Sequence, residues 1–486
     1  MCIREAEDHT ALLNFATRYF KLFRQSQYEK SQNQVFQMKP KRILIISAYF
    51  PPYPSVASLR PYSYAKYWAK MGHEVTVLTT KKYDSDSADL VLPIDKFDVV
   101  EVSYCDIKYK VAKALGMFRP ERKSHSCDVG SKPIDEQNGQ SLNRSFRGGK
   151  FLKKLRNISG RLLTDRIPDY RDPWIIPAIR RAKALIRSRD IQWIFSSYAP
   201  PSSHIIAGML RKEYACRWIA DYRDLWLENV VWVGKWPFTI LEKWLENKYV
   251  GGCADIITTV SQPLAEILRN KFKTPVYVIE NGYDEEDYDK HFPPYFAERK
   301  KRIIYTGTLW PGRRDPSPLF AAISSLANES MKIRAMMDHG IEVLFFGAES
   351  EWLNKLIGNH GVQRWVKYKG IVGGKDIRRI QSQADVLLFL ENGEADGILT
   401  GKLFEYLAAQ RPILGVGVSS KTTAGSLMEN AGVGLAVDSD VAKIRHVVMN
   451  LLEGHDPFPI SPNEGVIGQY TRKKQAARIL EIMDQI

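Results

Sequence analysis

The stretch Gly397-Ile-Leu-Thr-Gly-Lys-Leu-Phe-Glu-Tyr-Leu-Ala-Ala-Gln-Arg-Pro-Ile-Leu414 reads as a tight turn that opens a short helix, which an Arg-Pro pair then ends. A strand-like run, Asp385-Val-Leu-Leu-Phe-Leu390, precedes it. Backbone NH groups at a helix start are free to bind an anion, and the ammonium of Lys402, one residue past Gly401, could reach the same phosphate. Glu405 lies about one turn further on and could accept hydrogen bonds from vicinal hydroxyls. This pattern predicts a sugar-nucleotide pocket; the alternative is a core helix with a solvated Lys and Glu.

Strands and helices alternate in the same way through most of the chain, which predicts an α/β fold. Because 486 residues exceed the roughly 250 to 300 that one core supports, we expect two domains. The expectation is two doubly wound Rossmann-like domains facing a central crevice, where ligands bind beside the strand carboxyl ends. The expected strands cover residues 43–47, 74–79, 192–196, 217–221, 255–260, 276–280, 302–306, 342–346, 366–368, 385–390 and 413–416.

The domain boundaries follow from changes in composition. Residues 1–37 carry no strong period and are expected to form an extension. Regularity fades between residues 82 and 150, and the stretch 124–149 is polar and rich in Gly and Ser, so we expect a mobile insertion near 83–150. The expected order is an N-terminal domain over residues 38–285, a linker over 286–301, a C-terminal domain over 302–467 and a C-terminal helix over 468–486. The last helix has an apolar stripe that should pack against something.

Lys and Arg outnumber Asp and Glu by 70 to 55, giving a net charge of +15, which favours polyanionic partners: nucleic acid, an anionic leaflet or phosphorylated substrates. Between residues 150 and 189, basic side chains alternate with apolar ones that include Trp174. This suits a membrane interface, although an ordinary amphipathic helix is the alternative. Five scattered cysteines without a CxxC pair fit a reducing cytoplasm. No apolar run approaches the roughly 20 residues that span a bilayer.

Three passages resemble the GT-B glycosyltransferases, and within them the large retaining, family 4-like group that includes bacterial cell-wall and polysaccharide transferases. The loop Ala48-Tyr-Phe-Pro-Pro52 is followed by Gly72-His-Glu-Val75. Ala254-Asp-Ile-Ile-Thr-Thr-Val-Ser261 is followed by Asn281-Gly-Tyr-Asp284. The third passage is Gly401-Lys-Leu-Phe-Glu-Tyr-Leu407 with its Arg-Pro pair.

The resemblance implies that the N-terminal domain lies on the acceptor side, that the C-terminal domain binds the donor nucleotide sugar, and that a set of residues contacts this donor. Glu405 would contact the ribose hydroxyls of the donor, and Thr400 and Gly401 would offer backbone NH groups to its diphosphate. In Tyr305-Thr-Gly-Thr-Leu-Trp-Pro-Gly-Arg-Arg314, Arg313 occupies the family's basic position. With Lys402 it would neutralise the leaving diphosphate, and Gly307 of the same passage is expected beside the donor. A solvated pair is the alternative for Arg313 and Arg314.

Departures from the family pattern concern the transferred sugar and the first domain. Gly397 stands where the family commonly carries a second Glu, so Glu391 or Glu394 would have to take its contacts. Arg223 stands where many relatives have a His, while Asp224 is retained.

Asp221, Arg223, Asp224 and Trp226 follow a mid-domain strand and are expected to face the crevice, with Asp224 and Arg223 as catalytic candidates; a structural Arg-Asp pair is the alternative. His204 is a further catalytic candidate that could hydrogen-bond donor or acceptor hydroxyls, and its alternative is a structural role.

The sequence therefore predicts a glycosyltransferase that moves a sugar from a nucleotide diphosphate donor to an acceptor hydroxyl, with retention, in polysaccharide or glycolipid synthesis. The acceptor is a saccharide or a lipid-linked molecule, and the location is cytoplasmic, with peripheral attachment to the inner face of the membrane as an option. No P-loop, GxGxxG or metal-ligand spacing occurs, so we expect no cofactor and no metal. The alternatives are a sugar-nucleotide epimerase of the same fold and a basic nucleic-acid-binding protein; the absence of a recognition module argues against nucleic acid.

Overall fold

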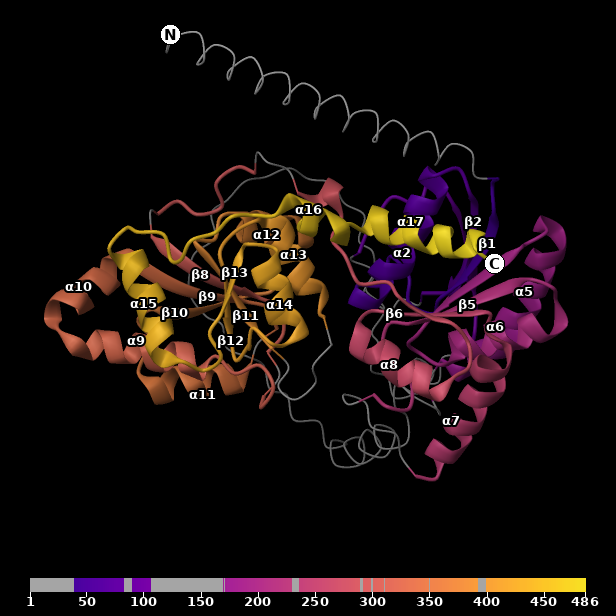
Figure 1. Cartoon of the computed structure of the whole chain (residues 1–486), viewed down its shortest axis with the longest axis horizontal. Coiled ribbons are helices and arrows are strands. Elements are labelled where there is room, and N and C mark those ends of the chain that lie inside the picture. The colour runs from indigo at the N-terminus through magenta and orange to yellow at the C-terminus, as the bar shows by residue number, and fades with distance from the viewer. Residues whose placement is uncertain are drawn as a thin grey trace, which may run out of the picture.

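The structure is a computed structural model that describes residues 39–82, 90–105, 169, 171–229, 236–288, 292–298, 300–309, 311–348, 350–391 and 399–486. Two α/β domains lie side by side, each built on a parallel sheet with helices on both faces (Figure 1). Buried apolar clusters on both faces of each sheet explain why the strands read as nearly continuous Val, Ile, Leu and Phe runs. The predicted fold class is confirmed.

The first domain contains a seven-stranded sheet of order β3-β2-β1-β4-β5-β6-β7. Every neighbouring pair is parallel, with registers such as Ile43 opposite Val75. Its elements are β1 (Arg42–Ile46), α2 (Val56–Lys70), β2 (Glu74–Thr80), β3 (Asp98–Val102), the 3-10 turn η1 (Asp172–Trp174), α5 (Ile175–Arg189), β4 (Trp193–Ser197), α6 (Ser202–Glu213), β5 (Arg217–Tyr222), α7 (Phe238–Glu246), the π-helical turn η2 (Asn247–Gly251), β6 (Ile256–Thr259), α8 (Gln262–Lys271) and β7 (Val276–Val278).

The second domain contains a six-stranded parallel sheet of order β10-β9-β8-β11-β12-β13. Its elements, after the 3-10 turn η3 (Glu285–Asp287), are β8 (Lys301–Thr306), α9 (Ser317–Glu329), α10 (Met331–Gly340), β9 (Ile341–Phe346), α11 (Glu351–His360), β10 (Val366–Gly370), α12 (Gly374–Ser382), β11 (Val386–Leu390), α13 (Gly401–Ala409), β12 (Ile413–Val416), α14 (Thr423–Asn430), β13 (Gly434–Ala436), α15 (Val441–Leu452), α16 (Glu464–Ile467), the 3-10 turn η4 (Gly468–Tyr470) and α17 (Arg472–Asp484).

The sequence prediction misses two strands, β3 and β13. Both lie at a sheet edge, so each has one neighbouring strand and only part of its length is buried. Weak burial leaves a weak apolar pattern, which is why periodicity does not reveal them. The expected extension over residues 1–37 and most of the expected insertion near 83–150 lie outside the described residues. The described part of that insertion, residues 90–105, contains β3, which pairs with β2 and so belongs to the sheet.

The C-terminal helix α17 returns from the second domain and packs against α2 of the first (Figure 1). Its apolar stripe joins the core beside α2, with Ala476 and Ile479 fully buried. The indole Nε1 of Trp68 donates a hydrogen bond of 2.9 Å to the carbonyl oxygen of Ala476. The chain therefore crosses between the domains twice, once before β8 and once before α17, and these two connections hold the domains on either side of the crevice.

Candidate functional site

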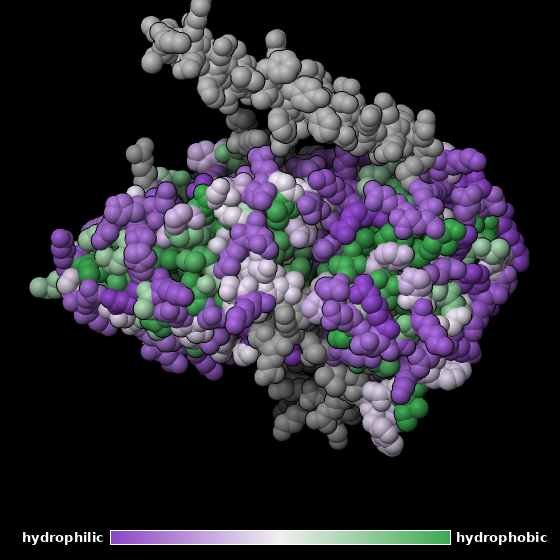
Figure 2. Space-filling model, viewed as in Figure 1, coloured by the Kyte–Doolittle hydropathy of each residue, from purple (hydrophilic) through white to green (hydrophobic). Residues whose placement is uncertain are grey.

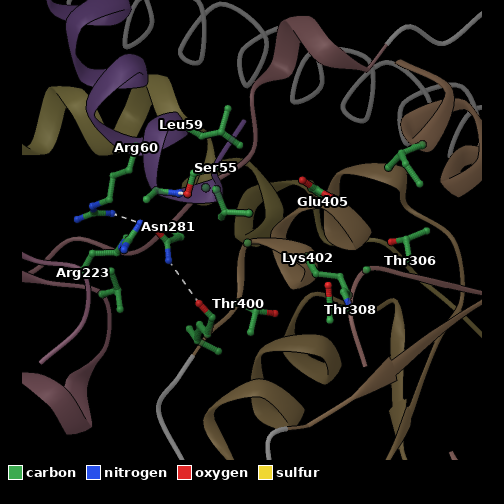
Figure 3. A pocket seen from close by; sticks show the side chains of 18 of the residues that line it. Ser55, Leu59, Arg60, Arg223, Asn281, Thr306, Thr308, Thr400, Lys402 and Glu405 are labelled. Atoms are coloured by element: carbon green, nitrogen blue, oxygen red, sulfur yellow. Dashed lines mark hydrogen bonds between the residues drawn. The ribbon is translucent and has the colours of Figure 1, made fainter. Parts of the chain in front are cut away.

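A cavity of about 840 Å³ lies between the two domains, at the carboxyl ends of their strands. Residues of both domains line it, and Figure 3 shows Lys402 and Glu405 of the second domain across from Arg60 and Arg223 of the first. The lining includes the six predicted donor-binding residues and two of the three predicted catalytic ones: Gly307, Arg313, Thr400, Gly401, Lys402, Glu405, Arg223 and Asp224.

The first turn of α13 opens into this cavity. Thr400 is its N-cap with extended backbone, and its side chain makes no capping hydrogen bond. A Cβ placed on Gly401 would meet no atom within 4 Å, so space for a ligand begins directly at this residue. The unpaired NH groups of the turn and the helix dipole make this a position for an anion.

The ammonium of Lys402 lies beside the same helix start. Its Nζ is 3.8 Å from the centroid of the Tyr305 ring, and it makes no ion pair with a described residue. Gly307 has φ of +115°, and a Cβ there would come within 2.9 Å of Cε and Nζ of Lys402. Burial and the charge of Arg314 hold the pKa of Lys402 well below its usual range. A bound phosphate would reverse that shift.

Glu405 is held on the next turn of α13 by a side-chain network. Its Oε2 accepts a hydrogen bond of 3.2 Å from Nε2 of the buried Gln381. The same Nε2 donates to Oγ1 of Thr306 at 3.0 Å, which fixes the amide. Oε1 of Glu405 has no hydrogen-bond partner in the described part of the chain, so it retains full capacity to accept from a ligand hydroxyl.

Both basic residues of the loop after β8 line the cavity. The Nη1 of Arg314 donates to the carbonyl oxygen of Thr308 at 3.0 Å. The charge of Arg314 acts on Lys402, whereas the sequence prediction assigns the role to Arg313 alone. Arg314 is therefore a further candidate for contact with an anion, and the only hint of it in the sequence is its position next to Arg313.

Arg223 and Asp224 lie just after β5 on the first-domain side of the cavity. Nε and Nη2 of Arg223 contact Oδ2 of Asp224 at 3.1 and 3.0 Å. Arg223 is largely buried, while the carboxylate side chain of Asp224 is 44% exposed. Trp226 is fully buried and does not line the cavity, so only part of the predicted cluster faces the crevice.

Sequence reasoning misses Arg60 of α2, which lines the cavity from a buried position. Its Nη2 pairs with Oδ1 of the fully buried Asp221 at 2.8 Å, and its Nη1 donates to the carbonyl oxygen of Glu280 at 2.9 Å. Asp221 also accepts from Oγ1 of Thr258 at 2.8 Å. A single sequence carries no signal that joins two residues so far apart, and the pair forms only when α2 packs on the sheet.

His204 is a correction to the sequence prediction, because the structure does not bring it to the cavity. It is fully buried on α6, and its Nδ1 lies 2.8 Å from Oγ of Ser196. Its ring packs 4.9 Å from the ring of Tyr222. Burial lowers the pKa of His204 to about 3, so the ring is neutral. The position of His204 therefore supports a structural role, which was the alternative to a catalytic one.

Glu391 does not line the cavity and accepts a hydrogen bond of 3.2 Å from Oγ1 of Thr422. Glu394 and Gly397 lie outside the described residues. Within the described ranges, no group of three or more His, Cys, Asp and Glu side chains could hold a metal ion. None of the described helices is long and apolar enough to span a bilayer.

Comparison with known proteins agrees with this architecture. Residues 146–287 match the family model of Glycosyltransferase Family 4. A glycosyltransferase from Rickettsia africae ESF-5 superposes with a TM-score of 0.57 and 14% identity, covering 92% of this chain and 99% of its own. Sucrose-phosphate synthase from Thermosynechococcus elongatus superposes with a TM-score of 0.53 and 12% identity, and the match covers 92% of this chain and 98% of the synthase. A UDP-forming α,α-trehalose-phosphate synthase from Burkholderia vietnamiensis superposes with a TM-score of 0.53 and 9% identity, and the match covers 92% of this chain and 100% of that synthase. No curated protein matches the sequence.

The chain has the GT-B fold, and the family match in its first domain together with this fold supports the prediction of a glycosyltransferase.

Proposed function

We propose that this protein transfers a sugar from a nucleoside diphosphate donor to an acceptor hydroxyl, with retention of anomeric configuration, in polysaccharide or glycolipid synthesis. The observation that carries the proposal is the convergence of the uncapped start of α13, Lys402 and Glu405 on one cavity between the domains. Phosphate groups and vicinal hydroxyls are the two chemistries that this arrangement accommodates together.

In this mechanism the donor diphosphate binds the first NH groups of α13 and the ammonium of Lys402, with Arg313 and Arg314 beside it. Oε1 of Glu405 accepts hydrogen bonds from the ribose hydroxyls. Negative charge builds on the diphosphate as its bond to the anomeric carbon breaks, and these fixed positive groups stabilise that charge. Binding of the phosphate also raises the pKa of Lys402 again and keeps it protonated.

The acceptor enters from the first-domain side, beside Arg223 and Asp224. Its hydroxyl oxygen forms the new bond to the anomeric carbon on the face that the diphosphate leaves, and its proton passes to the departing phosphate oxygen. Front-side attack of this kind gives retention without a protein nucleophile. Asp224 is paired with Arg223, so we assign the two to hydrogen bonding and orientation of the acceptor. Enclosure between the domains excludes water and limits hydrolysis of the donor.

The test incubates the purified protein with a panel of nucleotide sugars and measures released nucleoside diphosphate with and without saccharide or lipid-linked acceptors. Acceptor-dependent release that Glu405→Ala abolishes supports transfer, and the anomeric configuration of the product by NMR tests retention. Release of diphosphate together with a free epimerised sugar, independent of acceptor, would instead assign the epimerase alternative. Retardation of unrelated DNA at physiological salt would favour nucleic-acid binding.

The proposal includes a cytoplasmic location with peripheral attachment to the anionic inner leaflet. The +15 net charge supports it. Half of the basic and apolar segment over residues 150–189, namely residues 150–168 and 170, lies outside the described residues. Its aromatic residue, Trp174, is fully buried in the first-domain core and cannot insert into a bilayer, which corrects that part of the prediction.

A further inference from the structure

Helix α7 presents its two glutamates to the protein interior and several of its apolar residues to solvent. Glu242 and Glu246 are fully buried, whereas Ile240 is 65% and Trp244 53% exposed. A surface helix of a globular domain shows the opposite arrangement. Apolar residues, in green, come to the surface at the lower tip of the first domain in Figure 2, where Figure 1 draws α7.

The inward face of α7 is fixed by polar contacts. Oε1 of Glu246 accepts from the Tyr222 hydroxyl at 3.0 Å, and Oε2 pairs with Nζ of Lys271 at 2.6 Å. Burial raises the pKa of Glu246 to about 6. Because rotating the helix would break these contacts, its apolar face points outward as a fixed feature of the fold.

The exposed apolar residues form one stripe. Ile240 and Trp244 are four residues apart on α7 and therefore lie on one side of the helix, with Leu241 next to Ile240 in the chain. Trp236, 82% exposed, lies two residues before the helix begins. We call these four residues the α7 stripe. Several large exposed apolar residues gathered on one element mark a site of contact with another apolar phase.

Lysines surround the α7 stripe. Lys243 and Lys248 are exposed, and Nζ of Lys248 lies 4.1 Å from the Trp244 ring centroid. Lys212 contacts the neighbouring Tyr249 ring at 5.2 Å. No carboxylate of the described chain pairs with any of these three lysines, while the nearby Glu228 and Glu213 pair with other lysines. The surface therefore offers apolar groups and unneutralised positive charge.

We propose that α7 docks on an anionic lipid bilayer as an interfacial helix, with the α7 stripe among the acyl chain ends and the lysines at the headgroups. Tryptophan at both ends of the stripe suits this boundary, and lysines gain from anionic lipid. A two-fold contact with a second copy is disfavoured because the same patch, with Lys243 and Lys248, would face itself and bring the positive charges of the two copies together.

Docking through α7 places the active-site cavity close to the bilayer. Asn229 lines the cavity, and Trp236 follows it by seven residues, which span at most about 25 Å. An amphiphilic acceptor with its hydroxyl at the headgroup level could then reach the first-domain side of the cavity. This last step rests on the proposed function, whereas docking itself does not require turnover.

The experiment is cosedimentation of the full chain with vesicles of phosphatidylcholine and phosphatidylglycerol, and with phosphatidylcholine alone, across a salt series. One variant carries Ile240→Ser and Trp244→Ser, and another carries Lys243→Glu and Lys248→Glu. The matched control carries Met331→Ser and Lys332→Glu on α10, where Met331 is 90% exposed in the other domain. We expect the control to bind like wild type.

The apolar variant should lose about tenfold or more in partitioning. In the charge variant, partitioning onto anionic vesicles should fall about fivefold for each lysine replaced, and the remaining partitioning should depend less on salt concentration. Equal pelleting of wild type and both α7 variants, or no pelleting with anionic vesicles at low salt, would overturn the proposal.

Two further measurements assign the stripe to other occupants. A dimer that forms without vesicles and dissociates in the Ile240→Ser, Trp244→Ser variant would mean that a second copy covers it. A large fall in the urea midpoint of that variant, but not of the control, would mean that the chain itself covers it. Nucleoside diphosphate binding should be unchanged in every variant. If the wild-type protein itself binds no nucleoside diphosphate, that result counts against the proposed function. Vesicle binding would still test the docking of α7 independently.

Discussion

Gly307→Ala tests whether the position of the Lys402 ammonium controls donor binding. A Cβ at residue 307 would lie 2.9 Å from Cε and Nζ of Lys402, and ordinary contacts require about 3.5 to 4.0 Å. The flexible end of the lysine should therefore retreat by roughly 0.6 to 1 Å. Moving a unit charge from about 3 to about 4 Å from a phosphate loses about 1.4 kcal/mol at an effective dielectric of about 20. We expect nucleoside diphosphate affinity to fall about tenfold.

The substitution also strains the backbone, because φ of +115° is rarely adopted by an L side chain. That strain costs about 1 to 3 kcal/mol of folding stability. Gly454→Ala is the matched control: its φ is +82°, a Cβ at this residue would meet no atom within 4 Å, and it follows α15 away from the cavity. We expect Gly454→Ala to lower stability as well, while affinity stays within about twofold of wild type.

The assay is calorimetric titration with UDP, GDP and ADP in parallel, followed by a cycle with Lys402→Met. If Gly307→Ala weakens nucleoside diphosphate binding by displacing the Lys402 ammonium, the same substitution should change the affinity little in the Lys402→Met background. A tenfold loss that persists without the lysine would show that the added methyl group disturbs the cavity itself. Unchanged affinity in the folded Gly307→Ala protein would refute the link between this glycine and Lys402.

Glu405→Ala should weaken nucleoside diphosphate binding well over tenfold, since a hydrogen-bonded charge in an enclosed site contributes about 2 to 5 kcal/mol; equal calorimetric affinity would remove Glu405 from the donor site. Asp221→Ala leaves the buried Arg60 without its partner and should lower the free energy of unfolding by about 3 to 5 kcal/mol in urea titrations, and a change below the error of the method would contradict the pairing. Burial raises the pKa of Asp172 to about 6, so ionising it destabilises the folded state fully above that pH and not at all below its unfolded pKa near 3.8. Asp172→Asn should therefore stabilise the protein by up to about 3 kcal/mol at pH 7 and lose that advantage as the pH falls towards 4, which urea titrations at the two pH values would check. Turnover should survive chelation, because Lys402 and the helix NH groups supply the positive field; loss restored by magnesium or manganese would contradict this.

The sequence could predict that the candidate donor residues of α13 line one cavity, because these residues are close together in the chain. Thr400, Gly401, Lys402 and Glu405 occupy consecutive turns of one helix start, so the sequence order itself brings NH groups, ammonium and carboxylate together. Buried parallel strands likewise leave a strong apolar pattern, which made the two-domain α/β fold predictable.

The sequence by itself therefore determined the fold class, the order of most strands and helices, and the grouping of the candidate donor residues on α13. Only the tertiary structure decided which side chains meet across long separations: Arg60 with Asp221, and Gly307 with Lys402. It also placed His204 in the core, and it turned Glu242 and Glu246 of α7 inward while Trp244 faces out. Backbone hydrogen bonding and apolar spacing act between near neighbours, whereas burial depends on the surface against which an element packs, and no local pattern encodes that surface.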